Sequence, residues 1–249
     1  MKKTLTQRKP VLVSVLWALL LLAFYILGGV ITQVNKMNEI NSLLVYGAII
    51  WVSAFVAVIY IWRSDSNFAD RGFRTIQKGA NISVLYYLPA VIMELVGFAF
   101  GFSTVSISFI LAVIFFTLAV GFAEEIYFRG LIFKILEVKS IKKAILISSI
   151  IFAVTHLCNL IGGADIQYTV IQLIFAFVFG IVVAEVIYLT KSLIPVILWH
   201  FLHDCISCIQ KVPHINKLGI QAIMLIIYAV YMWNRIKVID NKHDEAVCL

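Results

Sequence analysis

The chain has 249 residues, of which 62% are hydrophobic and only 13% are charged, and its formal net charge is +7. Its mean hydropathy of +1.01 excludes a soluble globular or disordered protein of this length. The excess of Lys and Arg does not indicate a nucleic-acid partner, because the positive-inside rule of membrane proteins explains it more simply. We therefore predict a membrane protein with no nucleic-acid partner.

Long apolar runs recur along the chain. A helix of about 20 apolar residues spans a bilayer, and the sequence contains about eight such runs. They lack the strict alternation of barrel strands, so we expect helices. The predicted spans are residues 11–34, 42–62, 81–102, from about 105 into 121–130, 144–162, 166–189, 193–210 and 218–234. The expected fold is all-α: a polytopic transmembrane helical bundle in the lipid bilayer, forming a single domain over residues 1–249.

The positions of Lys and Arg predict the orientation of the chain. If eight spans alternate in direction, 17 of the 20 basic residues lie on the side of the termini. Only Lys36, Lys211 and Lys217 lie on the opposite side. Because cytoplasmic loops carry the excess of Lys and Arg, we expect a multi-pass protein of the cell membrane with both termini in the cytoplasm.

Three charged residues, Glu124, Glu125 and Arg129, lie in the segment 121–130 at the end of an apolar run. A charge at membrane depth costs about 3 kcal/mol on insertion scales, so such residues indicate function. Glu125 and Arg129 are one helical turn apart and can form an ion pair. Glu124 is turned about 100° around the helix, which leaves it free to take part in chemistry.

Histidines occur in two later spans. His156 follows Phe152 at a spacing of four, and His200 precedes Asp204 at the same spacing. A carboxylate one turn from an imidazole can fix its tautomer. Counted from the nearest basic loops, these groups and Glu124 lie roughly 15–20 Å deep. We therefore expect one pocket near mid-membrane, open toward the cytoplasm.

Other polar residues within the spans are interpreted as structural. Glu94 is expected to serve packing or a substrate path, and Glu185 to lie near the membrane interface because it is six residues from Lys191. His203 is expected to point away from His200.

A carboxylate and two histidines in a water-accessible pocket suit general-base activation of water. One histidine can orient the water or protonate a leaving amine, and another can donate to an oxyanion. Glutamate and histidine also bind zinc, although the H-E-x-x-H pattern is absent. Metal-free and metal-assisted attack both stay open; a divalent metal such as zinc would take its ligands from Glu124, His156 and His200.

The three motifs, Glu-Glu-x-x-x-Arg, Phe-x-x-x-His and His-x-x-x-Asp, occur in this order within residues 120–205. This arrangement resembles the family of type II CAAX prenyl proteases and bacteriocin-processing enzymes, also called the CPBP or Abi family. The resemblance implies an intramembrane endopeptidase, either glutamate-dependent or metal-dependent, in which Glu124 activates water and His156 assists it. His200 and residue 204 would stabilise the oxyanion.

Residue 204 departs from the family pattern, which often has Asn there. An ionised Asp accepts hydrogen bonds but donates none. We therefore favour a role for Asp204 in orienting His200.

The sequence thus predicts hydrolysis of a peptide bond near the cytoplasmic side, in a peptide or a membrane-anchored protein. Bacteriocin or peptide processing and immunity are the expected settings. The alternative is a non-proteolytic membrane immunity protein or partner-binding protein that uses the same fold.

Overall fold

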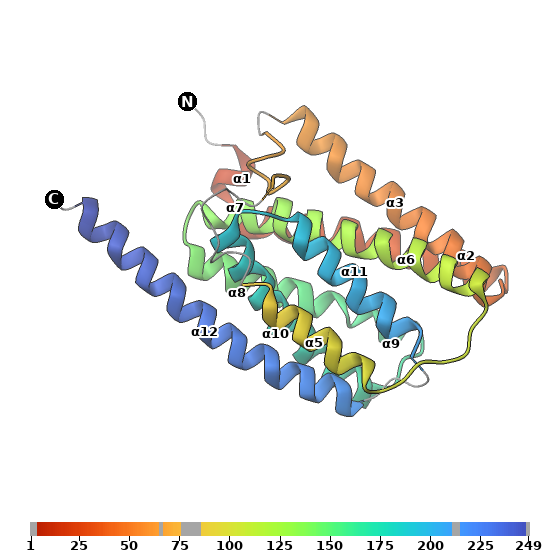
Figure 1. Ribbon diagram of the computed structural model, residues 1–249. Helices are drawn as coiled ribbons and strands as arrows, with labels where there is room; N and C mark the ends of the chain where they lie inside the picture. Colours follow the sequence, from red (N-terminus) through yellow and green to blue (C-terminus); the bar gives the residue numbers. More distant parts are fainter. Residues whose placement is uncertain (1–3, 65–66, 76–85, 211–214, 248–249) are drawn as a thin grey trace.

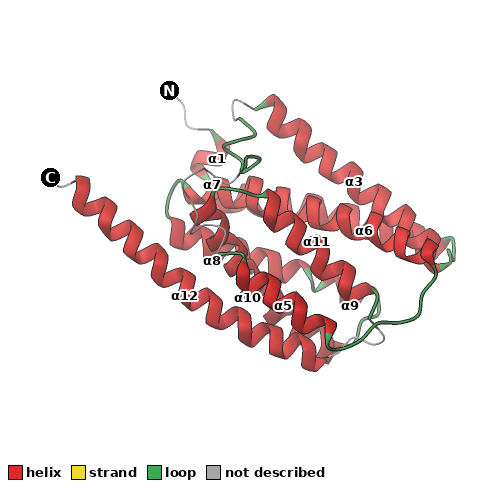
Figure 2. Ribbon diagram, in the orientation of Figure 1, coloured by secondary structure: helices red, strands yellow, loops and turns green. Residues whose placement is uncertain are grey.

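The computed structural model describes residues 4–64, 67–75, 86–210 and 215–247, and this part of the chain is helical throughout its regular elements (Figures 1 and 2). The elements are α1 (Leu5–Arg8), α2 (Pro10–Val34), α3 (Glu39–Arg63), α5 (Leu88–Phe98), α6 (Ile107–Glu125), the π-helix η1 (Ile126–Phe133), α7 (Lys134–Glu137), α8 (Ile141–Thr155), α9 (Cys158–Ile161), α10 (Ile166–Thr190), α11 (Ile194–Cys208) and α12 (Ile215–Val247). The predicted all-α fold is confirmed.

Several helices begin where a short polar side chain accepts a hydrogen bond from a backbone N–H of the first turn. Asn38 caps α3 and Ser106 caps α6 in this way. Ser140 and Asp165 do the same for α8 and α10. These caps end the polar connections and set the start of each apolar helix.

Six helical segments in the described residues are long and apolar enough to cross a membrane: Pro10–Val34, Glu39–Arg63, Ile107–Glu137, Ile141–Ile161, Ile166–Thr190 and Asn216–Val238. The sequence predicted about eight. The other two predicted spans correspond to the shorter apolar helices α5 and α11, of 11 and 15 residues. At 1.5 Å per residue these are shorter than a hydrocarbon core of about 30 Å. The first part of the predicted span 81–102 lies outside the described residues.

Helix α10 occupies the centre of the bundle. Of its most apolar window 61% is buried, compared with at most 39% for the other candidate spans. Helices α8 and α12 pack on it. Large apolar side chains such as Val52, Phe55 and Ile227 remain exposed on the outer helices, as a surface that faces lipid requires.

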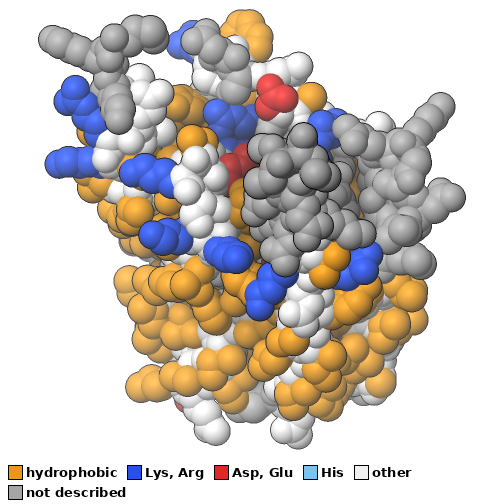
Figure 3. Space-filling model, turned by 90° about the vertical axis from the view of Figure 1, so that its left-hand side faces the viewer, with side chains coloured by type: hydrophobic (Ala, Val, Ile, Leu, Met, Phe, Trp, Pro, Cys, Tyr) orange, Lys and Arg blue, Asp and Glu red, His pale blue; other side chains and the backbone are white. Residues whose placement is uncertain are grey.

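The long helices alternate in direction, so the bundle has two distinct ends (Figure 1). We call one the basic end: α1, α7, the start of α8 and the last turns of α12 lie there, and Lys and Arg side chains gather on it (Figure 3). We call the other the α9 end, after the helix that lies there (Figure 1). Helix α1 and the last turns of α12 lie toward the same end of the bundle (Figure 1), which agrees with the prediction that both termini lie on one side.

Residues 67–75 pack against the bundle at the basic end. The Leu193 amide donates to the Gly72 carbonyl over 2.8 Å, and Arg71 Nη1 donates to the Gly130 carbonyl over 3.1 Å. Gly72 has a φ of +92°, and a Cβ there would meet Leu193 at 3.1 Å, so a side chain would be strained at this position. Phe73 packs on Phe122 with ring centroids 6.0 Å apart. This segment therefore covers the basic-end side of α6 and α11.

Candidate active site

Helices α6 and α11 approach closely where the predicted site residues lie. A Cβ on Gly121 would meet the Phe201 backbone nitrogen at 2.9 Å, so only glycine permits this packing. The close approach brings the glutamates at the end of α6 to the histidine in the middle of α11. The sequence motif and the helix packing are thus linked through one glycine.

His200 contacts three carboxylates. Its Nδ1 lies 2.8 Å from Glu125 Oε1, a hydrogen bond, while its Nε2 lies 3.7 Å from Glu124 Oε2 and 3.6 Å from Asp204 Oδ2. His200 is 5% exposed and Glu125 is fully buried. The short bond to Glu125 fixes the orientation of the ring. Asp204, which the sequence favoured for that task, lies at the other ring nitrogen, whereas the Glu125 carboxylate reaches across the α6–α11 contact to Nδ1.

The ion pair predicted between Glu125 and Arg129 is present, with Arg129 Nε 3.4 Å from Glu125 Oε2. The Arg129 guanidinium lies over the Phe152 ring, 4.5 Å from its centroid, and the side chain is 1% exposed. Aromatic faces stabilise a buried cation in this position. Phe152, from the Phe-x-x-x-His motif, thus stabilises the charge of Arg129, from the Glu-Glu-x-x-x-Arg motif.

The residues after Glu125 form a π-helix, which the sequence analysis did not predict. It spans Ile126–Phe133, and all eight of its residues are buried. Single π-helical turns inside α-helices occur frequently at functional sites. Its wider turn begins directly after the two glutamates and carries Arg129, so it contributes to the position of all three charged groups.

Glu124 faces away from this pair. Its Oε1 accepts a hydrogen bond of 2.7 Å from the Tyr25 hydroxyl, whereas its Oε2 is buried and has no hydrogen-bond partner. Tyr25 lies on α2, 99 residues earlier in the chain, and the sequence analysis missed it. A tyrosine within an apolar run carries no spacing signal that could have singled it out.

Glu124, His156, His200 and Asp204 line one cavity of about 360 Å³. His156 lies at the end of α8, where its Nδ1 is 3.1 Å from the Phe152 carbonyl oxygen. A neutral ring that donates from Nδ1 leaves Nε2 as an acceptor. The residues of the three motifs therefore meet in one place, as their spacing predicted.

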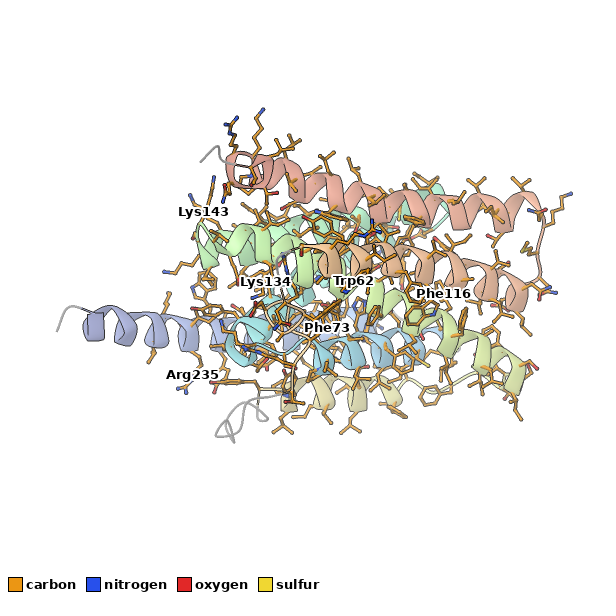
Figure 4. The ribbon with its side chains drawn as sticks, turned by 90° about the horizontal axis from the view of Figure 1, so that it is seen from above. Trp62, Phe73, Phe116, Lys134, Lys143 and Arg235 are labelled. Carbon is orange, nitrogen blue, oxygen red and sulfur yellow. The ribbon has the colours of Figure 1, made fainter. Side chains whose placement is uncertain are left out.

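The direction of this cavity differs from the prediction of a pocket open toward the basic, cytoplasmic side. Its lining includes Phe116 and Val120, which precede Glu124 on α6, and Cys208, which follows His200 on α11. Because α6 runs toward the basic end and α11 away from it, the cavity extends from Glu124 toward the α9 end (Figures 1 and 4). Packing of residues 67–75 at the basic end explains the difference.

A second cavity, of about 470 Å³, adjoins the first. Both are lined by Tyr25, Cys158 and Asn159, and the second reaches the turn of residues 162–164 after α9. The polar side chains of Asn159 and Gln172 are joined by a hydrogen bond of 2.9 Å on the wall of the first cavity. We call these two adjoining cavities the hollow; they lie between the charged groups and the α9 end.

The residues interpreted as structural lie apart from Glu124. His203 Nδ1 lies 3.1 Å from Glu94 Oε1, and Trp199 Nε1 donates to the same oxygen over 3.0 Å. His203 thus points away from His200, as expected. Glu185 was expected near the interface; its side chain is fully buried within the bundle, and neither of its carboxylate oxygens has a hydrogen-bond partner. The packing of α12 over α10 accounts for this burial.

The residues suggested as metal ligands, Glu124, His156 and His200, do not form a metal site in this structure. Among the described residues, no group of three or more His, Cys, Asp and Glu side chains is arranged to hold a metal ion. The bond of His156 Nδ1 to a backbone carbonyl is not the reason, because metal-binding histidines commonly make such a bond and use Nε2 as the ligand.

Comparison with known proteins gives one family match. Residues 106–206 match the family model described as Type II CAAX prenyl endopeptidase Rce1-like. The matched segment is similar to that family. It contains α6, η1, α8, α10 and most of α11, and so every predicted site residue, whereas Tyr25 and Glu94 lie outside it. A search of curated proteins found no match.

The family match confirms the resemblance seen in the sequence motifs. The Rce1-like family is a protease family, so the match supports peptidase activity at the family level. Together with the apolar helices, it also indicates a multi-pass membrane protein.

Proposed function

We propose that this chain is an intramembrane endopeptidase in which Glu124 activates a water molecule for attack on a peptide bond. One observation carries the proposal: Glu124 Oε2 is buried without a partner and faces His200 in a cavity within the Rce1-like segment. A carboxylate oxygen with no hydrogen-bond partner can accept a proton from water in the cavity.

The proposed reaction divides the work among the site residues. Glu124 removes a proton from water, and the resulting hydroxide attacks the scissile carbonyl carbon. His200, as the imidazolium, donates from Nε2 to the oxygen that becomes negative, while Nδ1 donates to Glu125. The carboxylates of Glu124, Glu125 and Asp204 favour that positive charge.

Collapse of the tetrahedral intermediate requires a proton on the leaving amine. His156 lines the same cavity, and its Nε2 is the ring nitrogen not engaged with the backbone. We propose that Glu124 passes the proton taken from water to the amine, with His156 holding the water or the amine in place. The Arg129–Glu125 pair fixes the position of the His200 ring and does not touch the substrate.

We further propose that the substrate is a peptide or a membrane-anchored protein that reaches Glu124 through the hollow from the α9 end. If the basic end faces the cytoplasm, as the distribution of Lys and Arg favours, the substrate approaches from the opposite side or laterally. Processing of a bacteriocin or another exported peptide fits that direction.

The test is a cleavage assay with the purified full chain in proteoliposomes, using a peptide library and a matched library with a prenylated cysteine. Mass spectrometry would identify new termini, and a chelator arm would report metal dependence. We expect cleavage that Glu124→Gln and His156→Ala each abolish or greatly reduce. Unchanged cleavage in correctly folded Glu124→Gln would overturn the proposal.

A second arm separates proteolysis from binding. Cells that express the wild type, Glu124→Ala or His156→Ala would be tested for bacteriocin resistance, with the amount of protein in the membrane as the control. Resistance that persists in both variants would assign that phenotype to binding of a partner.

A further inference from the structure

A groove on the outside of the bundle at the basic end lies apart from the catalytic cavity. It has a volume of about 680 Å³ and is formed by α8, α10 and α12. None of its lining residues lines the cavity of Glu124. The proteolytic mechanism therefore does not account for it.

The groove combines a cationic rim with an apolar wall. Lys142 and Lys143 stand at the start of α8, and Lys237 stands opposite them on α12. All three are exposed, and Figure 4 labels Lys143 at this end of the bundle. The wall is made mainly of aliphatic side chains and one tryptophan: Ile145, Leu146, Ile181, Ala229, Val230 and Trp233. Tryptophan is enriched at the level of the lipid headgroups.

One buried acid lines the groove. Glu185 has no exposed surface, and both of its carboxylate oxygens lack a hydrogen-bond partner. A buried polar group without a partner is destabilising, so such a group in a groove indicates a ligand that supplies a donor. Glu185 lies five residues before the end of α10 at the basic end, or about 8 Å deep. That depth is just below the level of the lysine ammonium groups.

We propose that this groove binds one anionic glycerophospholipid whose headgroup carries hydroxyls, as phosphatidylglycerol does. The phosphate lies among Lys142, Lys143 and Lys237, and a headgroup hydroxyl donates to Glu185. The acyl chains follow the apolar wall. Three cations against one acid give a net positive site, which selects an anionic lipid over a zwitterionic one.

The first test measures lipid binding to the purified full chain by native mass spectrometry. Phosphatidylglycerol and phosphatidylcholine with identical acyl chains are the probes, and we expect phosphatidylglycerol to bind more tightly. The variant Lys142→Gln/Lys143→Gln/Lys237→Gln should bind phosphatidylglycerol on the order of 100-fold more weakly, since each basic residue near a membrane contributes to binding of anionic lipid. The matched control, Arg8→Gln/Lys9→Gln/Lys139→Gln, removes three cations at the same end outside the groove and should bind as the wild type does.

The second test isolates Glu185. Phosphatidylmethanol has the same charge as phosphatidylglycerol but no headgroup hydroxyl. We expect the wild type to prefer phosphatidylglycerol by roughly tenfold, the usual size of a hydrogen bond to a charged group. Glu185→Leu should bind the two lipids equally.

Three results would overturn the proposal: equal binding of phosphatidylglycerol and phosphatidylcholine, equal loss in both triple variants, or an unchanged lipid preference in Glu185→Leu. A dimer that only the groove variants dissociate would also overturn it, because the groove would then hold a second copy of the chain. Proteolysis is not the readout, so these results are independent of the proposed function.

Discussion

Helix α11 carries two histidines, each bonded to a glutamate of another helix, and the two pairs differ in their surroundings. His200 is bonded to Glu125 over 2.8 Å and His203 to Glu94 over 3.1 Å, and each ring is 5% exposed. The second ring nitrogen of His200 faces Glu124 and Asp204 across a large cavity.

The other pair is enclosed by packing. Phe175 stacks on the His203 ring at 4.9 Å, and Trp199 shares the Glu94 oxygen that His203 contacts. His203 lines a smaller cavity of about 90 Å³, whose wall also includes His156, His200 and Asp204. Burial and hydrogen-bond length therefore do not distinguish His200, the proposed oxyanion donor, from His203. The distinguishing feature is the pair of carboxylates that face the second ring nitrogen of His200.

The largest expected effect comes from replacing one acid of each environment, Glu124 or Glu94, with glutamine. Glu124→Gln keeps the shape of the side chain but cannot take a proton from water, so we expect cleavage to fall by about 10³- to 10⁴-fold. Glu94→Gln keeps one acceptor for Trp199 and His203 but loses the charge. We expect it to lower the free energy of unfolding by about 1–3 kcal/mol while cleavage stays within a few-fold.

Peptide cleavage and thermal unfolding in the same detergent measure both effects. The contrast between the two pairs would fail if Glu94→Gln removed activity without loss of stability.

The next largest effect is expected at His200, and His203 serves as the comparison. His200→Ala removes the group proposed to donate to the oxyanion, and we expect kcat to fall by about 10²- to 10³-fold. His203→Ala removes a ring stacked on Phe175 and leaves Glu94 with one partner fewer, so its main effect should be a loss of about 2–3 kcal/mol of stability.

Separate kcat and KM values, measured with melting temperatures, distinguish the two effects. A stable His203→Ala protein with a kcat as low as that of His200→Ala would place His203 in the catalytic machinery.

The sequence could predict the residues of the site because they lie on regular helices. Spacings of four in helices placed Glu125 with Arg129 and His200 near Asp204, and counts from the basic loops placed His156 and His200 at comparable depth. Residues whose positions depend on contacts between distant helices could not be predicted. Tyr25 reaches Glu124 only through the packing of α2 on the bundle, and the burial of Glu185 depends on α12.

Two features of the backbone were not predicted from the sequence, and they lie in contact with each other. The π-helix after Glu125 and the packing of residues 67–75 both meet at Gly130, whose carbonyl accepts from Arg71. Hydropathy reports how apolar a segment is, but not whether a polar loop folds back onto it. The described lining of the cavity lies on the α9 side of Glu124, which the hydropathy of the chain did not indicate.

A smaller effect is expected from Tyr25, whose hydroxyl holds Glu124 in place. Tyr25→Phe removes only the hydrogen bond to the Glu124 carboxylate, and we expect kcat to fall by about tenfold, in line with a bond to a charged group. Tyr46→Phe is the matched control, because its ring packs on Tyr25 at 5.9 Å in a T-shaped contact. We expect it to retain nearly full kcat. Equal kcat values in the two variants would show that the Tyr25 hydroxyl does not position the base.

The smallest effect is expected at Asp204. Its carboxylate is 30% exposed and lies 3.6 Å from His200 Nε2, while Glu125 already fixes the ring through Nδ1. Asp204→Asn loses one of three negative charges near the imidazolium but gains an amide that can donate to the oxyanion. These changes oppose each other, so we expect cleavage to stay within about threefold of the wild type.

The side chain in Asp204→Ala can neither accept nor donate a hydrogen bond, so we expect its kcat to fall further, by about tenfold. Measuring kcat for both variants separates the roles of the residue. If the Asn variant were inactive but folded, the negative charge of Asp204 would itself be required to keep His200 protonated. The exposed side of the site would then contribute as much to the chemistry as the buried Glu125 does.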